Sequence, residues 1–478
     1  FYASVEFVPS NSIWPHVKGL NEYITRCQSV LQSGKPDNEI LVYWPVYDAW
    51  YHCNPKKLDL QLGVDNLQEW PKPTDFYSTV KDLMNSGYSV DFVSDNLLDS
   101  AKVDNGQIVT SGKAGPYKVL IVPQSDFIPI PTLKKILELA KTGATVIFKE
   151  LPADVPGFME RDLRKQQMQE LISILKFEKT GDGIQEVKTG SGSILLSEEI
   201  QKALQSENVN LETLVDAGLK FIRRDIDGEK YYYLANHTAN TIDSWLILNT
   251  AAKSVLIMDP LDGRTGLADA TAIKDKIQVR VKIRSGEALI LRTYNKVVKG
   301  RYWSYPGQEK EAILISGDWD VKFIRGGPEI PKEQRISKLI SWTDLPDTNA
   351  LRFSGSAIYS TSFTLKEKDA EDYLLRLGDV RESAHVRINK KDAGILWSVP
   401  FELRIGKFLK KGENILEIEV ANLMANRIRD MDRRGVVWRK FHEINFVDLN
   451  YEPFDASGWE LQPSGLLGPV SLLPLSGH

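Results

Sequence analysis

The stretch Leu377–Asp430, LGDVRESAHVRINKKDAGILWSVPFELRIGKFLKKGENILEIEVANLMANRIRD, decides the fold of the C-terminal part of the chain. Apolar and polar residues alternate with a period of two in AHVRIN, FELRI and ILEIEV. This alternation predicts strands with one buried face and one solvated face. The segments NKKDAG and KKGEN supply turn residues between the strands. The stretch therefore predicts an antiparallel β-sandwich of the kind found in carbohydrate-binding and accessory modules.

Length and charge bound the rest of the chain. At 478 residues it is expected to hold two to four domains. A formal net charge of −4 and a pI near 6.0 provide no electrostatic footprint for nucleic acid. No apolar run approaches the roughly 20 residues that a membrane-spanning helix needs. We therefore expect neither a nucleic-acid partner nor a membrane span.

Residues 36–180 alternate apolar runs with helical patterns. The expected strands are ILVYWPVY (Ile40–Tyr47), YSVDFVS (Tyr88–Ser94), YKVLIVPQ (Tyr117–Gln124) and ATVIFKE (Ala144–Glu150), and the expected helices cover about 75–86, 131–142 and 160–175. Continuous apolar runs are typical of parallel strands that are buried on both faces. This order predicts a flavodoxin-like, doubly wound parallel sheet.

The segments on either side of this α/β region have different patterns. Residues 14–32 predict an amphipathic helix. Its apolar residues, expected mostly on one face, are Ile13, Val17, Leu20, Ile24, Val30 and Leu31. Residues 181–305 alternate and turn at Asp-Gly pairs, which predicts a small β-sandwich with a linker. Residues 306–478 form the C-terminal β-sandwich, so the fold class is multidomain α/β plus all-β.

Three carboxylates follow predicted strands of the α/β region. They are Asp48, Asp126 and Glu150. Ligands of doubly wound sheets bind beyond the carboxyl ends of the strands. This carboxylate edge is therefore a candidate for acid–base chemistry or cation binding. The alternative is that Asp126 and Glu150 cap helices or accept hydrogen bonds from loops.

Aromatic residues surround the first of these carboxylates. Tyr43 and Trp44 lie inside the predicted strand and are expected in the core. Tyr47, Trp50 and Tyr51 lie at its end or beyond it, where they can stack on the apolar faces of sugar rings. Tyr47, Asp48 and Trp50 are therefore candidate sugar-binding residues.

A second candidate sugar-binding cluster lies in the C-terminal domain. It contains Asn426, Arg427 and Asp430, whose side chains can bind hydroxyl groups. The alternative is a loop whose polar side chains pair with one another. Trp397 is expected in the core, and His385 is expected at a core or surface position.

Several other kinds of site are not supported. No glycine-rich phosphate loop follows the first strand, where DAWYHCNP stands. Cys27 and Cys53 are too few for a disulfide framework or a zinc site. His52 beside Cys53 is weak evidence for a catalytic dyad, because no third residue in view orients them.

Long motifs resemble one known family. FYASVEFVPSNSIWPHVKGLNEYITRCQSVLQSGKP followed by ILVYWPVYDAW resembles the segment that leaves the catalytic barrel in glycoside hydrolase family 106, the α-L-rhamnosidases. The C-terminal sandwich of that family is similar to SGSAIYSTSFTL, LGDVRESAHVRINKKDAGILWSVPFEL, GENILEIEVANLMANRI and PSGLLGPVSL. The resemblance covers essentially the whole chain in the right order. It implies a last sandwich of jelly-roll or galactose-binding type.

The resemblance also carries expectations about activity. The family removes terminal α-L-rhamnose from plant glycans by an inverting, calcium-assisted mechanism that uses two carboxylates of a (β/α)₈ barrel. Residues 1–35 are then a remnant of the end of that barrel, and the catalytic pair is expected upstream of Phe1. No catalytic residue or metal ligand is transferred to this chain. The remnant should either pack on a neighbouring domain or depend on the missing barrel portion.

Three hypotheses follow. In the first, the chain is the non-catalytic C-terminal portion of a rhamnosidase-like glycosidase, exported to the periplasm or beyond, with a rhamnose-containing glycan as its partner. This chain requires no cofactor, and calcium serves the parent enzyme. The second hypothesis is a carbohydrate-binding or structural module. The third is a distinct enzyme that uses the carboxylate edge.

Overall fold

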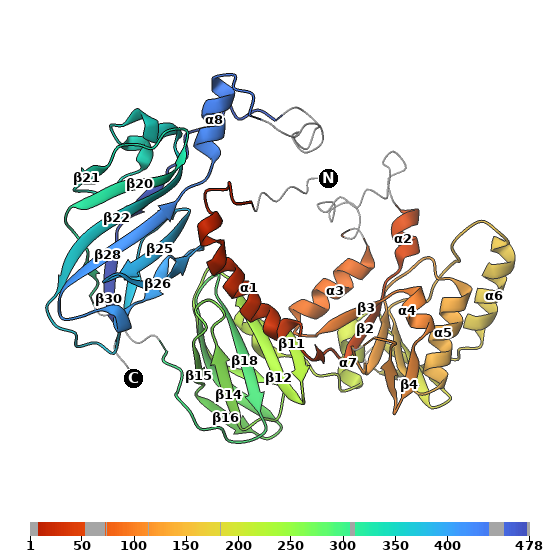
Figure 1. Ribbon diagram of the computed structural model, residues 1–478. Coiled ribbons are helices and arrows are strands. Elements are labelled where there is room, and N and C mark those ends of the chain that lie inside the picture. The colour runs from red at the N-terminus through yellow and green to blue at the C-terminus, as the bar shows by residue number, and fades with distance from the viewer. Residues whose placement is uncertain are drawn as a thin grey trace. The chain divides into compact units, whose positions relative to one another are not determined.

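The protein is described by a computed structural model that covers residues 8–52, 72, 74–112, 114–181, 183–305, 311–438 and 454–475 (Figure 1). The chain divides into two compact units, of which one is Cys27–Trp303 and the other combines Phe1–Arg26 with Ser304–His478. It contains a mixed, mostly parallel sheet and several antiparallel sheets. The predicted combination of α/β and β-rich regions is therefore confirmed.

The unit Cys27–Trp303 contains a seven-stranded sheet in the order β3-β2-β6-β7-β10-β9-β8. Its strands are β2 (Ile40–Tyr43), β3 (Val90–Val93), β6 (Val119–Val122), β7 (Thr145–Phe148), β8 (Glu178–Gly181), β9 (Ile184–Thr189) and β10 (Gly192–Leu196). The first five strands in this order are parallel, and β9 and β8 continue the sheet antiparallel. The sheet thus extends beyond residue 180, where the sequence analysis placed a domain boundary.

The first strand of this sheet is shorter than expected. The predicted strand ran from Ile40 to Tyr47, whereas β2 ends at Tyr43 and helix α2 occupies Val46–Tyr51. Pro45 stands between them as the residue that precedes the helix. Proline has no N–H to donate to a strand ladder, so the apolar run cannot continue as a central strand.

Helices cover both faces of the parallel sheet. They are α3 (Asp75–Asn85) and α7 (Ile200–Ser206) on one face, and α4 (Asp95–Asp99), α5 (Ile130–Lys141) and α6 (Arg161–Ser173) on the other (Figure 1). Alternate residues of β2 serve the two layers. Ile40 and Val42 pack with α3 and α7, while Leu41 and Tyr43 pack with α4 and α5. Both faces are therefore buried, which explains the continuous apolar run.

The rest of this unit is β-rich. A six-stranded antiparallel sheet is formed by β1 (Lys35–Pro36), β11 (Leu219–Ile226), β12 (Glu229–Asn236), β18 (Ala288–Tyr294), β14 (Ser254–Met258) and β15 (Thr265–Leu267). A three-stranded sheet is formed by β13 (Ile242–Leu248), β17 (Lys276–Ile283) and β16 (Ala270–Ile273). Shorter elements are the hairpin of β4 (Lys102–Asp104) and β5 (Gln107–Val109) and the 3₁₀ turn η2 (Thr213–Ala217).

In the other unit, two antiparallel sheets bury one hydrophobic core. The six-stranded sheet contains β21 (Gln334–Ile336), β20 (Trp319–Gly327), β22 (Ser354–Leu365), β28 (Gly412–Ala421), β25 (Ser383–Ile388) and β26 (Lys391–Leu396). The four-stranded sheet contains β19 (Ile313–Leu314), β30 (Ser471–Leu475), β23 (Asp372–Arg376) and β27 (Glu402–Arg404). Both sheets contribute to the core, which includes Val321, Tyr359 and Ile418 from the first and Leu375 and Leu472 from the second. The alternation in Leu377–Asp430 therefore predicted the buried positions correctly.

The same unit holds several short elements. They are β24 (Asp379–Arg381) paired with β29 (Gly465–Gly468), helix α8 (Ala425–Arg433), and the 3₁₀ turns η1 (Trp14–His16), η3 (Trp342–Asp344), η4 (Thr348–Arg352) and η5 (Gly406–Phe408). Helix α1 (Val17–Leu31) follows η1, so the predicted helix is confirmed.

The buried face of α1 differs from the expected one. The buried positions include His16 before the helix, then Gly19, Cys27 and Val30, whereas Ile24 is 38% exposed. The pattern of apolar residues could not predict this buried face, because the helix makes its closest contact at Gly19, which has no side chain.

Candidate functional site

The candidate site begins at the carboxyl edge of the parallel sheet, in the loops after β2, β6, β7 and β10. Asp48 follows β2 as part of α2, Asp126 follows β6, and Glu150 follows β7. The structure therefore places all three predicted carboxylates at this edge. Their individual partners decide what each of them can do.

Asp48 joins two loops. Its side chain is buried, and its two carboxylate oxygens accept hydrogen bonds from the backbone N–H groups of Asp126 and Phe127, each at 2.8 Å. Burial raises the pKa of the Asp48 carboxyl above its ordinary value, while these hydrogen bonds act in the opposite direction. The carboxylate thus ties the loop after β2 to the loop after β6, as expected of a structural group.

Asp126 and its neighbours form the exposed part of the edge. The Oδ2 atom of Asp126 lies 3.0 Å from Nε2 of His52, and both side chains are about half exposed. The ring of Tyr51 packs on Phe127 with centroids 4.5 Å apart. The exposed fraction is 51% for Trp50 and 69% for Tyr51. This surface combines open aromatic faces with hydrogen-bonding groups, which is the chemistry that sugar binding requires.

Tyr47 belongs to the same helix but is less open. Its ring lies 5.5 Å from that of Trp50 in an edge-to-face arrangement. Burial, and next the charge of Asp95, raise the pKa of its phenol above the ordinary value. Tyr43, predicted in the core, is fully buried and donates to Asp95 at 2.9 Å. Of the predicted aromatic group, Trp50 and Tyr51 are therefore the accessible members.

Glu150 pairs with a different neighbour. Its Oε2 accepts a hydrogen bond of 3.0 Å from the Gln124 amide. The adjacent Lys149 forms an ion pair with Asp75 at the start of α3, and Asp75 also accepts from the backbone N–H of Gln124 at 2.9 Å. The structure thus brings Asp48 and Asp126 together, whereas Glu150 belongs to a second network.

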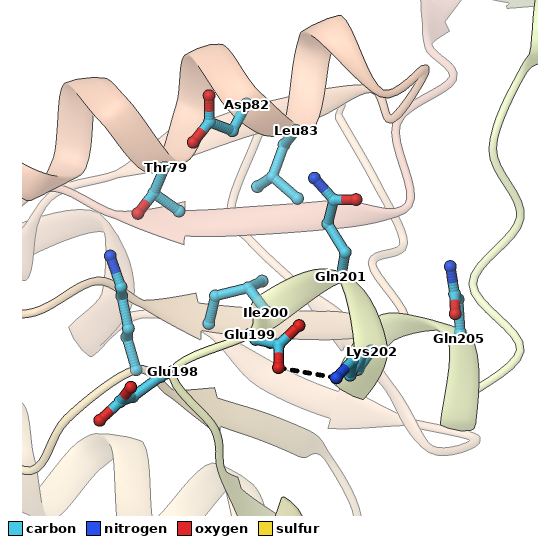
Figure 2. Close-up of a pocket in the computed structure, with 10 residues that line it drawn as sticks. Thr79, Asp82, Leu83, Glu198, Glu199, Ile200, Gln201, Lys202 and Gln205 are labelled. Atoms are coloured by element: carbon cyan, nitrogen blue, oxygen red, sulfur yellow. Dashed lines mark hydrogen bonds and ion pairs between the residues drawn. The ribbon is translucent and has the colours of Figure 1, made fainter. Parts of the chain in front are cut away.

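A polar cavity lies farther along the same edge, between α3 and α7. Its volume is about 500 Å³. Figure 2 shows Thr79, Asp82 and Leu83 of α3 facing α7 and the preceding residues Glu198 and Glu199. Lys202 and Glu199 form an ion pair of 2.7 Å.

This cavity could not be predicted from an α/β domain that ends at residue 180, because α7 lies beyond that boundary. The apolar run GSILLS (Gly192–Ser197), followed by the α7 pattern, was the signal that could have found it.

The predicted cluster of the C-terminal domain lies on α8. Asn426 is buried and exchanges two hydrogen bonds of 2.8 Å with the backbone of Gln462. Asp430 pairs with Arg434 at 2.7 Å. Arg427 lies close to Gly327, where an added Cβ would come within 2.8 Å of the guanidinium. Asn426 and Asp430 are therefore engaged inside the protein, and sugar contact at this cluster stays a prediction.

The remaining predicted residues have the following positions. Trp397 is half-buried against Tyr23, with ring centroids 5.3 Å apart. Nε2 of His385 lies 2.9 Å from Oδ1 of Asp392, which accepts the hydrogen bond. Cys27 is buried in α1. Cys53 lies outside the described residues. The interpretations that involve it, a site shared with Cys27 and a dyad with His52, therefore also lie outside them. Within the described ranges, no group of three or more His, Cys, Asp or Glu side chains is placed to hold a metal ion.

Membrane insertion through a helix finds no support in the described part of the chain. None of its helices is both long enough and apolar enough to cross a bilayer.

Comparison with known proteins defines the class. The chain has the fold of the rhamnosidase from Novosphingobium sp. PP1Y, with a TM-score of 0.74 and 23% identity over 98% of this chain and 42% of that one. A putative beta-glucuronidase from Formosa agariphila is 30% identical over 228 residues, which are 42% of this chain and 19% of that relative. The chain is thus a portion related to glycoside hydrolases, with a rhamnosidase-like fold.

The family follows from a narrower match. Residues 66–268 match the family model of glycoside hydrolase family 106, described as alpha-L-rhamnosidase. Over these residues the chain resembles family 106, so the predicted resemblance is confirmed. The chain spans less than half the length of the solved rhamnosidase and less than a fifth of the curated relative.

Proposed function

We propose that the chain is the non-catalytic C-terminal portion of an α-L-rhamnosidase-like glycoside hydrolase that acts on rhamnose-containing plant glycans. The family match and the rhamnosidase-like fold support the class of enzyme. In this proposal the parent protein is exported, and calcium serves the parent enzyme.

The single observation that carries this proposal is the engagement of the edge carboxylates. An inverting glycosidase needs an acid and a base about 6.5–9.5 Å apart, with room for water and sugar between them. Here both oxygens of Asp48 are held by backbone amides. Asp126 and Glu150 are paired separately with His52 and Gln124. These contacts support a structural role for the three edge carboxylates, with the catalytic pair elsewhere in the parent protein.

The domain types are part of the same proposal. The strand order β3-β2-β6-β7-β10 corresponds to the order 2-1-3-4-5, which supports a flavodoxin-like domain. Its switch point lies between β2 and β6, where the Asp48 carboxylate accepts hydrogen bonds from two backbone amides of the loop after β6. The two antiparallel sheets around one core support a jelly-roll or galactose-binding-like C-terminal sandwich. The β-rich segment before it is the smaller sandwich.

One observation favours a second function, sugar binding at the carboxyl edge. Trp50 and Tyr51 are exposed beside the hydrogen-bonding pair of His52 and Asp126. Aromatic faces of this kind offer stacking surface, and the polar pair can bind hydroxyl groups. In this proposal the α/β domain holds glycan while the upstream barrel cleaves it.

Both functions are tested with the full chain. We expect no hydrolysis of an aryl α-L-rhamnoside in the presence of calcium. Calorimetric titration with rhamnose-containing oligosaccharides is expected to give saturable binding that falls at least tenfold in a Trp50→Ala, Tyr51→Ala double variant. Trp245→Ala is the control, because Trp245 is a similarly exposed tryptophan on β13.

The outcomes separate the hypotheses. Turnover that is lost in Asp126→Asn or Glu150→Gln would overturn the non-catalytic assignment and favour a distinct enzyme at this edge. The absence of both turnover and binding would leave the first function standing and remove the second.

A further inference from the structure

The first described residues of the chain pack on its C-terminal sheet. We call residues 8–26 the N-terminal segment; it comprises η1 and the first part of α1. Ser12 donates a hydrogen bond to the backbone carbonyl of Asn422. An added Cβ on Gly19 would lie 2.9 Å from Ile395 and 3.1 Å from Trp397, so the helix approaches β26 closely. The described part of this segment therefore contacts the sheet through Ser12 and Gly19.

His16 lies at the centre of this contact. Its side chain is 2% exposed, and its Nδ1 lies 2.7 Å from the Ser383 hydroxyl of β25. Its Nε2 is buried without a hydrogen-bond partner. Since a buried N–H without an acceptor is costly, the arrangement favours the neutral imidazole with its proton on Nδ1.

The charged groups around His16 disfavour a second proton. Glu419 of β28 lies 3.8 Å from Nε2, but its carboxylate is already paired with Arg325 of β20. The ring of His385 lies 6.3 Å away and is itself hydrogen-bonded to Asp392 at 2.9 Å. An imidazolium at position 16 would therefore be buried beside a guanidinium, with its nearest carboxylate committed elsewhere.

We propose that the N-terminal segment is held on the C-terminal sheet by a pH-sensitive latch, in which protonation of His16 releases the segment. Protonation in the docked state requires a buried cation. Protonation after release places the same cation in water. Acid therefore favours the released segment, and neutral pH restores the contact.

The electrostatics give the direction and the range of this effect. Burial, and next the neighbouring His385 and Arg325, lower the pKa of His16 from 6.5 to about 4. The released state binds more protons between these two values, so docking is most favourable above pH 6.5 and weakens as the pH falls towards 4. This difference corresponds to a weakening of the docking equilibrium by about 30-fold between pH 7.5 and pH 5.

The test measures the titration of His16 and the docking of the segment in the full chain. ¹³C-histidine NMR resolves the six histidines, with His16 assigned by its loss in His16→Gln. Amide exchange followed by mass spectrometry reports the protection of residues 17–26, corrected for the intrinsic effect of pH. We expect protection to fall about 30-fold from pH 7.5 to pH 5, and to be independent of pH in His16→Gln.

Two further variants test the role of the neighbouring charge and provide a control. Arg325→Met frees Glu419 to pair with His16, so the fall in protection should become smaller. His237→Gln changes an exposed histidine of β12's C-terminal loop and should leave the wild-type fall intact. Protection of the wild type that is constant with pH, or an unchanged fall in Arg325→Met, would overturn the latch. A pKa of His16 near its ordinary value in the docked wild type would also overturn the latch. This measurement does not depend on whether His16→Gln docks.

Discussion

Glu212 is a buried charge that contributes to the stability of the fold. Its side chain has no exposed surface and accepts from Arg223 at 2.7 Å, from the Tyr232 hydroxyl at 3.0 Å and from the backbone N–H of Asn249 at 3.0 Å. Burial alone would lower the pKa of the Arg223 guanidinium, but the adjacent Asp37 and Glu212 raise it overall. The buried carboxylate therefore connects β11, β12 and the start of the Asn249 loop.

Removing that charge should be costly. In Glu212→Gln the buried Arg223 keeps only Asp37 as a charged partner, and we expect a loss of about 3 kcal/mol in the free energy of unfolding. Urea unfolding measures this loss, with amide exchange of β11 and β12 as the readout for this part of the chain. Asp216→Asn, an exposed carboxylate of η2, is the control and should stay within about 0.5 kcal/mol of wild type. Equal effects of the two variants would contradict the buried-charge argument.

The candidate site marks the limit of residue-scale prediction. The position of Asp48 after a strand could be predicted, because an apolar run followed by polar residues is a local pattern. Its partners could not, because the amides of Asp126 and Phe127 lie 78 and 79 residues away. The same holds for His16 and Ser383, which are separated by 367 residues. A carboxylate or imidazole takes its role from such partners.

At the scale of elements, the packing of α1 on β26 requires a close approach of the helix backbone. Helices usually pack through apolar ridges, but here Gly19 permits Ile395 and Trp397 to approach the helix backbone. Tyr23 completes the contact by packing on Trp397. Trp397, predicted in the core, is therefore half-buried under a helix that is distant in sequence.

Enlarging Gly19 should disrupt this contact. In Gly19→Leu the new side chain overlaps Ile395, and we expect docking to weaken by about 1–3 kcal/mol. Exchange protection of residues 17–26 at pH 7.5 measures the change. Asn21→Leu on the exposed face of α1 introduces the same side chain, and also raises helix propensity, without the overlap. If both variants retain wild-type protection, the close packing at Gly19 has no energetic importance.

At the scale of the whole molecule, the compact units do not follow the order of the chain. One unit combines Phe1–Arg26 with Ser304–His478. Its N-terminal part covers residues of β25, β26 and β28 that would otherwise face water. The thermal stability of the C-terminal sheets should therefore depend on residues at the other end of the sequence.

Deletion of residues 1–26 tests this dependence. A loss of about 2 kcal/mol would lower the melting midpoint of a domain of this size by roughly 4–8 °C. Scanning calorimetry is expected to show this shift in the transition of residues 304–478, identified by exchange at β25 and β26, and little change in that of residues 27–303. A uniform shift of both transitions would instead indicate that the deletion disturbs the whole chain.

The sequence by itself determined most of the regular elements and the resemblance to a family. Strand alternation, apolar runs and turn residues act over a few positions, so β2, β6, β7 and β25–β28 could be predicted, and long motifs identified the relationship to family 106. Only the tertiary structure decided which polar groups remain available. It placed β10 in the parallel sheet, engaged Asp48 and Asn426 with backbone groups, and buried His16 between the N-terminal segment and the C-terminal sheet. The reason is physical: secondary structure follows from local periodicity, whereas burial and pairing depend on residues that only folding brings together.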